Sequence, residues 1–208
     1  MGKSVKRRPL KKRSTGKMIC IRTEGENTEP EYFNGLISQL RIPRSLVDCK
    51  FAGGSDPKTV VTALIKEKKK NKEAAKKGYP LIDEFWAVFD TEAGRPGLGD
   101  AIKLASSRGF NCAISAPSFE YWILLHYKKT ARPFCSCSEI ERELKRLVRG
   151  GYSKSGYDVV DVLDRLSEAK GNIKQLRREF VDHSLYDLPN TNVDELVGVI
   201  EGACADKG

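Results

Sequence analysis

The stretch Glu84-Phe-Trp-Ala-Val-Phe-Asp90-Thr-Glu92 decides the fold, because it places an unbroken apolar run between acidic residues. Such a run is typical of a buried strand, and this one ends in carboxylates. The same arrangement occurs nearer the N-terminus in Met18-Ile-Cys-Ile-Arg-Thr-Glu24. In an open parallel sheet, ligands bind at the edge formed by the carboxyl ends of the strands. The sequence therefore predicts that these acidic side chains gather at one such edge.

Strands and helices alternate on either side of these segments. Two more strands are predicted at residues 46–51 and 110–115, and helices at 28–42, 58–77, 100–107 and 121–127. Thr28 and Glu31 have the spacing of a capping box. From residue 136 onward the chain is mainly helical, over 139–148, 159–180 with a break near Gly171, and 193–202. The alternation predicts an α/β fold with a sheet of about four parallel strands flanked by helices and a mainly helical C-terminal part.

The positive charge is concentrated at the N-terminus. The net charge is +9, and residues 1–17 alone contribute +8 without any acid. We expect residues 1–17 to be a basic, disordered tail, either a solubilising extension or an arm that binds nucleic acid. Residues 18–208 are expected to form one domain, with an α/β core at 18–127 and a helical extension at 128–208. The lysines from Lys66 to Lys77 are interpreted as the solvated face of a helix.

Composition argues against membrane-spanning and secreted classes of protein. No apolar run approaches the roughly 18 residues of a membrane span. The N-terminus lacks the apolar segment of a secretory signal. The six cysteines do not have the spacing of a disulfide scaffold. A cytoplasmic location without a membrane partner is therefore the simplest expectation.

Acidic residues follow three of the predicted strands. Glu24 follows the first, Asp90 and Glu92 end the third, and Glu120 opens the helix after the fourth. Asp90 and Glu92 are two residues apart, so both point to the same side of an extended segment. Carboxylates and a substrate phosphate can hold Mg²⁺, and two such ions about 4 Å apart can cleave a phosphodiester. The pattern predicts a Mg²⁺ or Mn²⁺ site that acts on DNA or RNA.

Four motifs give the chain a more specific resemblance. They are Thr23-Glu-Gly-Glu-Asn-Thr-Glu-Pro-Glu-Tyr-Phe33, Phe89-Asp-Thr-Glu92, Ala116-Pro-Ser-Phe-Glu-Tyr-Trp-Ile-Leu-Leu-His126 and Asn190-Thr-Asn-Val193. With these motifs the chain resembles the RloB-like family from about residue 18 to residue 200. The turn Glu24-Gly25 and the later acidic pair also resemble the Toprim pattern of topoisomerases, primases and OLD-type nucleases. The resemblance implies a Toprim-like fold.

The resemblance implies roles for individual acids. Glu24 would act as general acid/base or as metal ligand, and Asp90 and Glu92 would hold the metal. The second acid of the pair is a glutamate here, which puts one metal position in doubt. OLD-type nucleases carry a further acid shortly after the first, for which Glu29 is the best match and Glu26 the next.

Other site residues are implied in the same way. Ser118 and Glu120 match a Ser-x-Glu pair, in which Glu120 would bind metal and take part in catalysis. Lys154 is the candidate for a lysine whose ammonium group stabilises negative charge on the phosphate. Gly25 and His126 are expected to support the site, although His126 lies on an apolar helix, where a core role is favoured over a catalytic one.

RloB-like proteins are similar to components of prokaryotic restriction and abortive-infection loci. The function implied is a metal-dependent nuclease, with tRNA among its candidate substrates, that acts in antiphage defence beside an AAA/ABC-type ATPase. The chain has no Gly-x-x-x-x-Gly-Lys-Ser/Thr motif, so a partner would hydrolyse any ATP. The alternatives are a non-catalytic nucleic-acid-binding or regulatory module and a nucleotidyl transferase or primase. A homodimer is left open.

Two further motifs are interpreted as structural and not as ligand-binding sites. Cys135-Ser-Cys137 lacks the second set of ligands that a zinc site needs. Gly53-Gly54-Ser55 precedes a helix and could hold a phosphate on its backbone amides, but an ordinary turn is the favoured interpretation.

Overall fold

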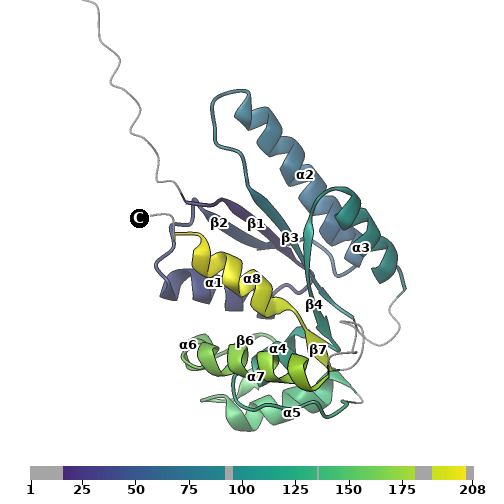
Figure 1. Cartoon of the computed structure of the whole chain (residues 1–208), viewed down its shortest axis with the longest axis vertical. Coiled ribbons are helices and arrows are strands. Elements are labelled where there is room, and N and C mark those ends of the chain that lie inside the picture. Colours follow the sequence, from purple (N-terminus) through teal and green to yellow (C-terminus); the bar gives the residue numbers. More distant parts are fainter. Residues whose placement is uncertain (1–15, 92–95, 135, 181–188, 205–208) are drawn as a thin grey trace, which may run out of the picture.

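A five-stranded sheet organises the part of the chain that the computed structural model describes, residues 16–91, 96–134, 136–180 and 189–204. Its strands lie in the order β2-β1-β3-β4-β7 (Figure 1). The parallel strands are β1 (Ile19–Thr23), β2 (Val47–Phe51), β3 (Glu84–Asp90) and β4 (Asn111–Ala116), and β7 (Asn190–Thr191) is antiparallel to β4. The α/β expectation is confirmed. The fifth strand was missed because two residues are too few to form an alternating pattern.

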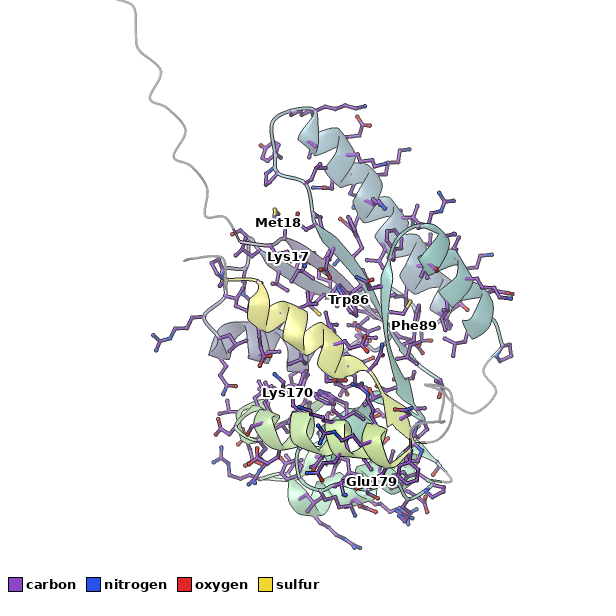
Figure 2. All side chains as sticks on the ribbon, viewed as in Figure 1. Lys17, Met18, Trp86, Phe89, Lys170 and Glu179 are labelled. Carbon is purple, nitrogen blue, oxygen red and sulfur yellow. The ribbon has the colours of Figure 1, made fainter. Side chains whose placement is uncertain are left out.

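The side chains of β3 alternate between the two faces of the sheet, so this strand contributes to two cores. Trp86 belongs to one core and Phe89 to the other (Figure 2). The core of Trp86 is shared by α1 (Thr28–Gln39), α4 (Phe119–Leu124) and α8 (Val193–Gly202). The core of Phe89 is shared by α2 (Pro57–Ala75) and α3 (Leu98–Ser107), which lie together on one side in Figure 1. Helices therefore cover both faces of the parallel strands, as a buried sheet requires.

The two long helices near the N-terminus begin differently. α2 has Asp56 as its N-cap, and the Asp56 carboxylate accepts a hydrogen bond from the Thr59 N–H at 3.1 Å. The capping box predicted for Thr28 and Glu31 is wrong. Asn27 is the N-cap of α1, and Thr28 already lies inside the helix. The Thr28 hydroxyl is therefore free to face a different part of the chain.

The C-terminal part contains α5 (Cys137–Leu147), α6 (Val159–Leu163) and α7 (Leu166–Glu179), which lie below the sheet in Figure 1. The prediction that a helix over 159–180 breaks near Gly171 is wrong, because the break falls after Leu163 and Gly171 lies inside α7. Leu163 and Ala169 are both buried in the core of Trp86. Six residues apart on a straight helix, they would point about 120° away from each other. The turn between α6 and α7 lets both face the core.

A two-stranded hairpin, which the sequence did not predict, lies between α5 and α6. It consists of β5 (Tyr152–Ser153) and β6 (Gly156–Tyr157). The prediction that the helix after β4 is central is confirmed, since every residue of α4 is buried. None of the described helices is long and apolar enough to cross a membrane. Residues 1–15, most of the predicted basic tail, lie outside the described residues.

Candidate functional site

The carboxyl ends of β1 and β3 bring two of the predicted acids together. Thr23 pairs with Val88 in the parallel register, and the Glu24 N–H donates a hydrogen bond to the Val88 carbonyl at 3.2 Å. The Glu24 side chain turns toward β3, where Oε2 accepts a hydrogen bond from the Asp90 N–H at 3.4 Å. Glu24 and Asp90 therefore lie at the same edge of the sheet, as expected for neighbouring parallel strands.

A cavity of about 210 Å³ opens at this edge. The residues that line it are Glu24, Gly25, Glu26, Asn27, Thr28, Glu29, Ser55, Asp90, Glu120 and Lys154. Six predicted site residues are in this set: Glu24, Gly25, Glu29, Asp90, Glu120 and Lys154. The predicted ligand Glu92 lies outside the described residues. Residues that are up to 130 positions apart in the sequence thus meet around one small volume.

Of the two candidates for the further acid, Glu29 is the one held inside the site. Its side chain is buried, whereas Glu26 is exposed at the rim. Glu29 Oε1 accepts a hydrogen bond from the Gly25 N–H at 2.8 Å. A Cβ atom at position 25 would overlap the Glu29 carboxylate, so the approach requires glycine. Burial raises the pKa of Glu29, and nearby Glu120 raises it further against the opposing effect of hydrogen bonds.

One oxygen of the Asp90 carboxyl group is left without a partner by the residues that the structure describes. Its Oδ1 atom is buried and accepts no hydrogen bond within the described residues. Burial raises the pKa of Asp90 well above its ordinary value, the negative charges of Glu29 and Glu120 raise it further, and Lys154 opposes them. A buried carboxyl group in this situation is stabilised by a proton or by a cation.

Glu120 and Lys154 form the opposite wall of the cavity. Glu120 is only 2% exposed, and its Oε1 atom lies 3.7 Å from Lys154 Nζ. Lys154 also lies 3.5 Å from Glu141 on α5. Burial alone would lower the pKa of Lys154, but the charges of Glu120 and Glu141 raise it above its ordinary value. The ammonium group therefore stays charged at the mouth of the cavity.

Tyr152, on the unexpected hairpin, is a site residue that the sequence analysis did not identify. Its hydroxyl donates a hydrogen bond to Glu120 Oε1 at 3.0 Å and lies 3.5 Å from the Thr28 hydroxyl. Gly150, Gly151 and Gly156 all have positive φ angles. Glycines on both sides of Tyr152 and Lys154 were the available signal for a hairpin. The hairpin thus carries two side chains to the same carboxylate.

His126 lies in the core and does not line the cavity. It is 1% exposed, its Nδ1 lies 3.0 Å from the Trp122 carbonyl, and its Nε2 lies 3.1 Å from the Tyr32 hydroxyl. Because a carbonyl can only accept, Nδ1 carries the proton and Nε2 accepts from Tyr32. Burial lowers the pKa of His126 to about 4, so the ring is neutral. Its support of the site is through packing of α4.

Ser118 also lies away from the cavity. It is the N-cap residue of α4, but its hydroxyl does not bond to the helix. Its oxygen is buried and, within the described residues, has no hydrogen-bond partner. The Thr91 hydroxyl, one residue after Asp90, is also buried and has no hydrogen-bond partner within the described residues. Of the Ser-x-Glu pair, the structure therefore brings only Glu120 to the cavity.

The donor set suits a hard divalent cation. Glu24, Asp90 and Glu120 offer carboxylate oxygens, and Oδ1 of Asp90 has acceptor capacity to spare. Mg²⁺ prefers such oxygens and keeps several of its waters, so it needs few protein ligands. Among the residues that the structure describes, no three His, Cys, Asp or Glu side chains are arranged as a complete metal site. Glu24 and Asp90 would hold an ion, with Glu120 facing it.

Comparison with known proteins gives one match. The family model described as RloB-like protein matches residues 19–200, which is most of the chain. Neither the curated proteins nor the solved structures gave a match. The matched range includes every residue that lines the cavity.

Proposed function

The chain belongs to the RloB-like family, and on that premise we propose that it is a divalent-metal-dependent nuclease of Toprim-like fold that hydrolyses phosphodiester bonds in DNA or RNA. The observation that carries the proposal is the buried Oδ1 atom of the half-buried Asp90, which lies near Glu24, Glu29 and Glu120 and is unpartnered within the described residues. A group of buried acids with too little positive charge is suited to a cation.

Some of these residues would hold the cation, and others would contact the phosphate of the substrate. A bound Mg²⁺ or Mn²⁺ supplies Lewis acidity and makes water more acidic. Glu24 and Asp90 would hold the ion, and Glu120 is fixed in orientation by the Tyr152 hydroxyl. Lys154 keeps its charge beside Glu120, where it can stabilise negative charge on a phosphate.

The proposal extends to antiphage defence with an AAA/ABC-type ATPase partner. Family membership supports this context, as does the resemblance to restriction and abortive-infection components. A tRNA substrate belongs to the same proposal and has the same support.

Lys154 also favours a second candidate, a non-catalytic module that binds nucleic acid or a regulatory partner. Its ammonium group already lies 3.7 Å from Glu120 and 3.5 Å from Glu141, so it offsets part of the negative charge without a metal. In such a module the cavity would be a structural ion-pair cluster, and Mn²⁺ would not raise the melting temperature of the protein.

The deciding experiment compares Mn²⁺-dependent cleavage of plasmid DNA and of total tRNA by wild type, Glu24→Gln and Glu26→Gln. Glu24→Gln should lower the cleavage rate at least about 100-fold, the usual range for a lost acid–base group or ligand. Glu26→Gln is the matched control, because it removes the same charge from an exposed position two residues away. Its rate should stay within about twofold of wild type, in line with a single exposed rim charge.

Equal cleavage by wild type and Glu24→Gln would rule out the proposed nuclease. If none of the three proteins cleaves, the Mn²⁺ dependence of the melting temperature separates the two candidates. A metal site at Glu24 and Asp90 raises the melting temperature of wild type and not of Glu24→Gln, because a ligand of the folded state stabilises it. An unchanged melting temperature in wild type supports the non-catalytic module.

A further inference from the structure

We call the cavity lined by Glu24, Asp90 and Glu120 the acidic cavity. A second, larger hollow lies beside the edge strand β2 and the helix α2. Its volume is about 700 Å³. We call it the basic groove, and the residues that line it are Arg22, Lys50, Phe51, Ala52, Asp56, Lys58, Thr59, Thr62, Ala63, Lys66, Glu67 and Lys70. Five of these side chains are cationic and two are acidic. The groove is therefore a concave surface of net positive charge.

The groove begins next to the acidic cavity. Ser55 lines the cavity and Asp56, the next residue, lines the groove. From this loop, α2 leads away from this edge of the sheet (Figure 1). Lys58 and Lys70 are twelve positions apart, which corresponds to about 18 Å along a helix. This length matches about five base steps of a nucleic acid strand.

Lys50 pairs with Asp48 at 2.8 Å, but the other three lysines of the groove are available to an anion. Lys58 and Lys66 are exposed, and within the described residues neither forms an ion pair. Lys70 pairs with Glu67 at 3.0 Å, but its side chain is 72% exposed. Exposed pairs of this kind contribute about 0–1 kcal/mol, so Lys70 can exchange its partner at little cost.

The other lysines of α2 have different surroundings, which makes the groove distinct from a uniformly charged helix. Lys68 packs over the rings of Phe85 and Phe110, at 5.7 and 5.0 Å, and donates a hydrogen bond to the Arg108 carbonyl. Lys69 and Lys72 are exposed and do not line the groove. Lysine side chains thus gather on the groove side at positions 58, 66 and 70, at helical spacings of eight and four.

We infer that the basic groove is the track along which the phosphate backbone of the substrate nucleic acid runs on its way into the acidic cavity. The acidic cavity repels a polyanion, so the backbone needs a positive surface that leads to it. Lys58, Lys66 and Lys70 supply that surface with single charges, which suit phosphates without reading sequence. The start of α2 is not the anion site, because the negatively charged Asp56 carboxylate already caps it and accepts from the Thr59 N–H.

This inference rests on the proposed function only in taking nucleic acid as the substrate, and the test separates the two. Binding is measured in a chelator, so that no hydrolysis occurs, with a labelled single strand and a labelled duplex of the same length. The groove variant is Lys58→Gln/Lys66→Gln/Lys70→Gln. The matched control is Lys69→Gln/Lys72→Gln/Lys77→Gln, which removes the same charge from exposed lysines outside the groove.

The groove variant should bind more weakly than the control at every salt concentration. Each lost phosphate contact lowers the slope of log affinity against log salt by about 1, so the triple change should lower it by about 3. The control should keep the wild-type slope to within about 1. In a parallel measurement on wild type, nucleic acid should protect Lys58, Lys66 and Lys70 from acetylation and leave Lys69 and Lys72 reactive.

Equal weakening by both triple variants, or no protection of the three groove lysines, overturns the track. Absence of binding by wild type overturns it as well. If Glu24→Gln cleaves normally while the groove variant fails to bind, the nuclease proposal is lost and the track stands. If the groove variant binds normally while Glu24→Gln fails to cleave, the track is lost and the nuclease proposal stands.

Discussion

Arg22 and Glu24 lie two residues apart at the end of β1, yet their surroundings differ. Arg22 lies among residues of opposite charge, whereas Glu24 lies mainly among residues of the same charge. Arg22 is 5% exposed, and its guanidinium lies 2.9 Å from Asp48 and 3.6 Å from Glu67. Glu24 is 7% exposed and accepts a hydrogen bond from the backbone N–H of Asp90, beside a cavity lined by further acids. The first cluster is neutralised by the chain itself. The residues described around the second include more carboxylates than cationic groups.

The difference separates a structural use of buried charge from a functional one. A buried charge costs several kcal/mol unless it is paired, so a fold normally supplies the partner, as it does for Arg22. Where the described residues leave a carboxyl oxygen without a partner, as at Oδ1 of Asp90, the deficit supports the proposed cation site. Three predictions test this distinction between the Arg22 cluster and the acidic cavity.

The largest effect is expected from a third buried group, His126, which the fold keeps neutral. Its pKa is lowered to about 4 in the folded protein, against about 6.5 in the unfolded chain. The unfolded chain therefore takes up the proton first as the pH falls, so stability is lost between about pH 6.5 and pH 4, by up to about 3 kcal/mol. Urea unfolding of wild type and His126→Gln at pH 7 and pH 4 measures this loss.

His126→Gln should lose most of that pH dependence, although it is less stable at pH 7. An equally steep loss in the variant would place the acid sensitivity elsewhere, and the acidic cavity would then be the first region to examine.

Removing the internal partner should cost less but still be clear. Arg22→Met leaves Asp48 without its guanidinium and should lower the free energy of unfolding by about 2 kcal/mol, the range for hydrogen bonds to charged groups. Adding Asp48→Asn should restore part of the loss, since it removes the carboxylate left behind. Urea unfolding measures each loss, and an Arg22→Met variant as stable as wild type would contradict the pairing of Arg22 with Asp48.

The smallest effect should have the opposite sign. Because burial and neighbouring acids raise the pKa of Asp90, its charge costs stability as the pH rises above the ordinary range of an aspartate. Asp90→Asn should therefore stabilise the metal-free protein at pH 8. Thermal unfolding in a chelator measures it, with Glu26→Gln as an exposed control. Loss of stability in Asp90→Asn would mean that the fold does compensate this carboxylate.

Much of the fold follows from the sequence because its strands and helices have strong local patterns. The apolar run of β3, the Asp56-Pro57 start of α2 and the acids after β1 and β3 are all local features. Their meeting at one edge follows from parallel pairing. The positions of Glu24 and Asp90 could therefore be predicted before any coordinates were known.

The rest depends on contacts between distant segments, which leave weak local signals. β7 and the hairpin strands have two residues each, too few for periodicity. Tyr152 reaches Glu120 across 32 positions of sequence, and the resemblance provided only Lys154 from that hairpin. The break between α6 and α7 contains no glycine or proline, because packing of Leu163 and Ala169 places it. The basic groove depends on which lysines of one helix face β2, which charge patterning alone did not resolve.

The overlap that any side chain at position 25 would have with Glu29 carries a consequence for how relatives of this chain can diverge. A side chain at 25 would push the Glu29 carboxylate away from the backbone N–H that it now accepts from, so a change at the first position alters the second. Sequences of the family should therefore show the two positions covarying, with non-glycine residues at 25 confined to members that have lost the acid at 29.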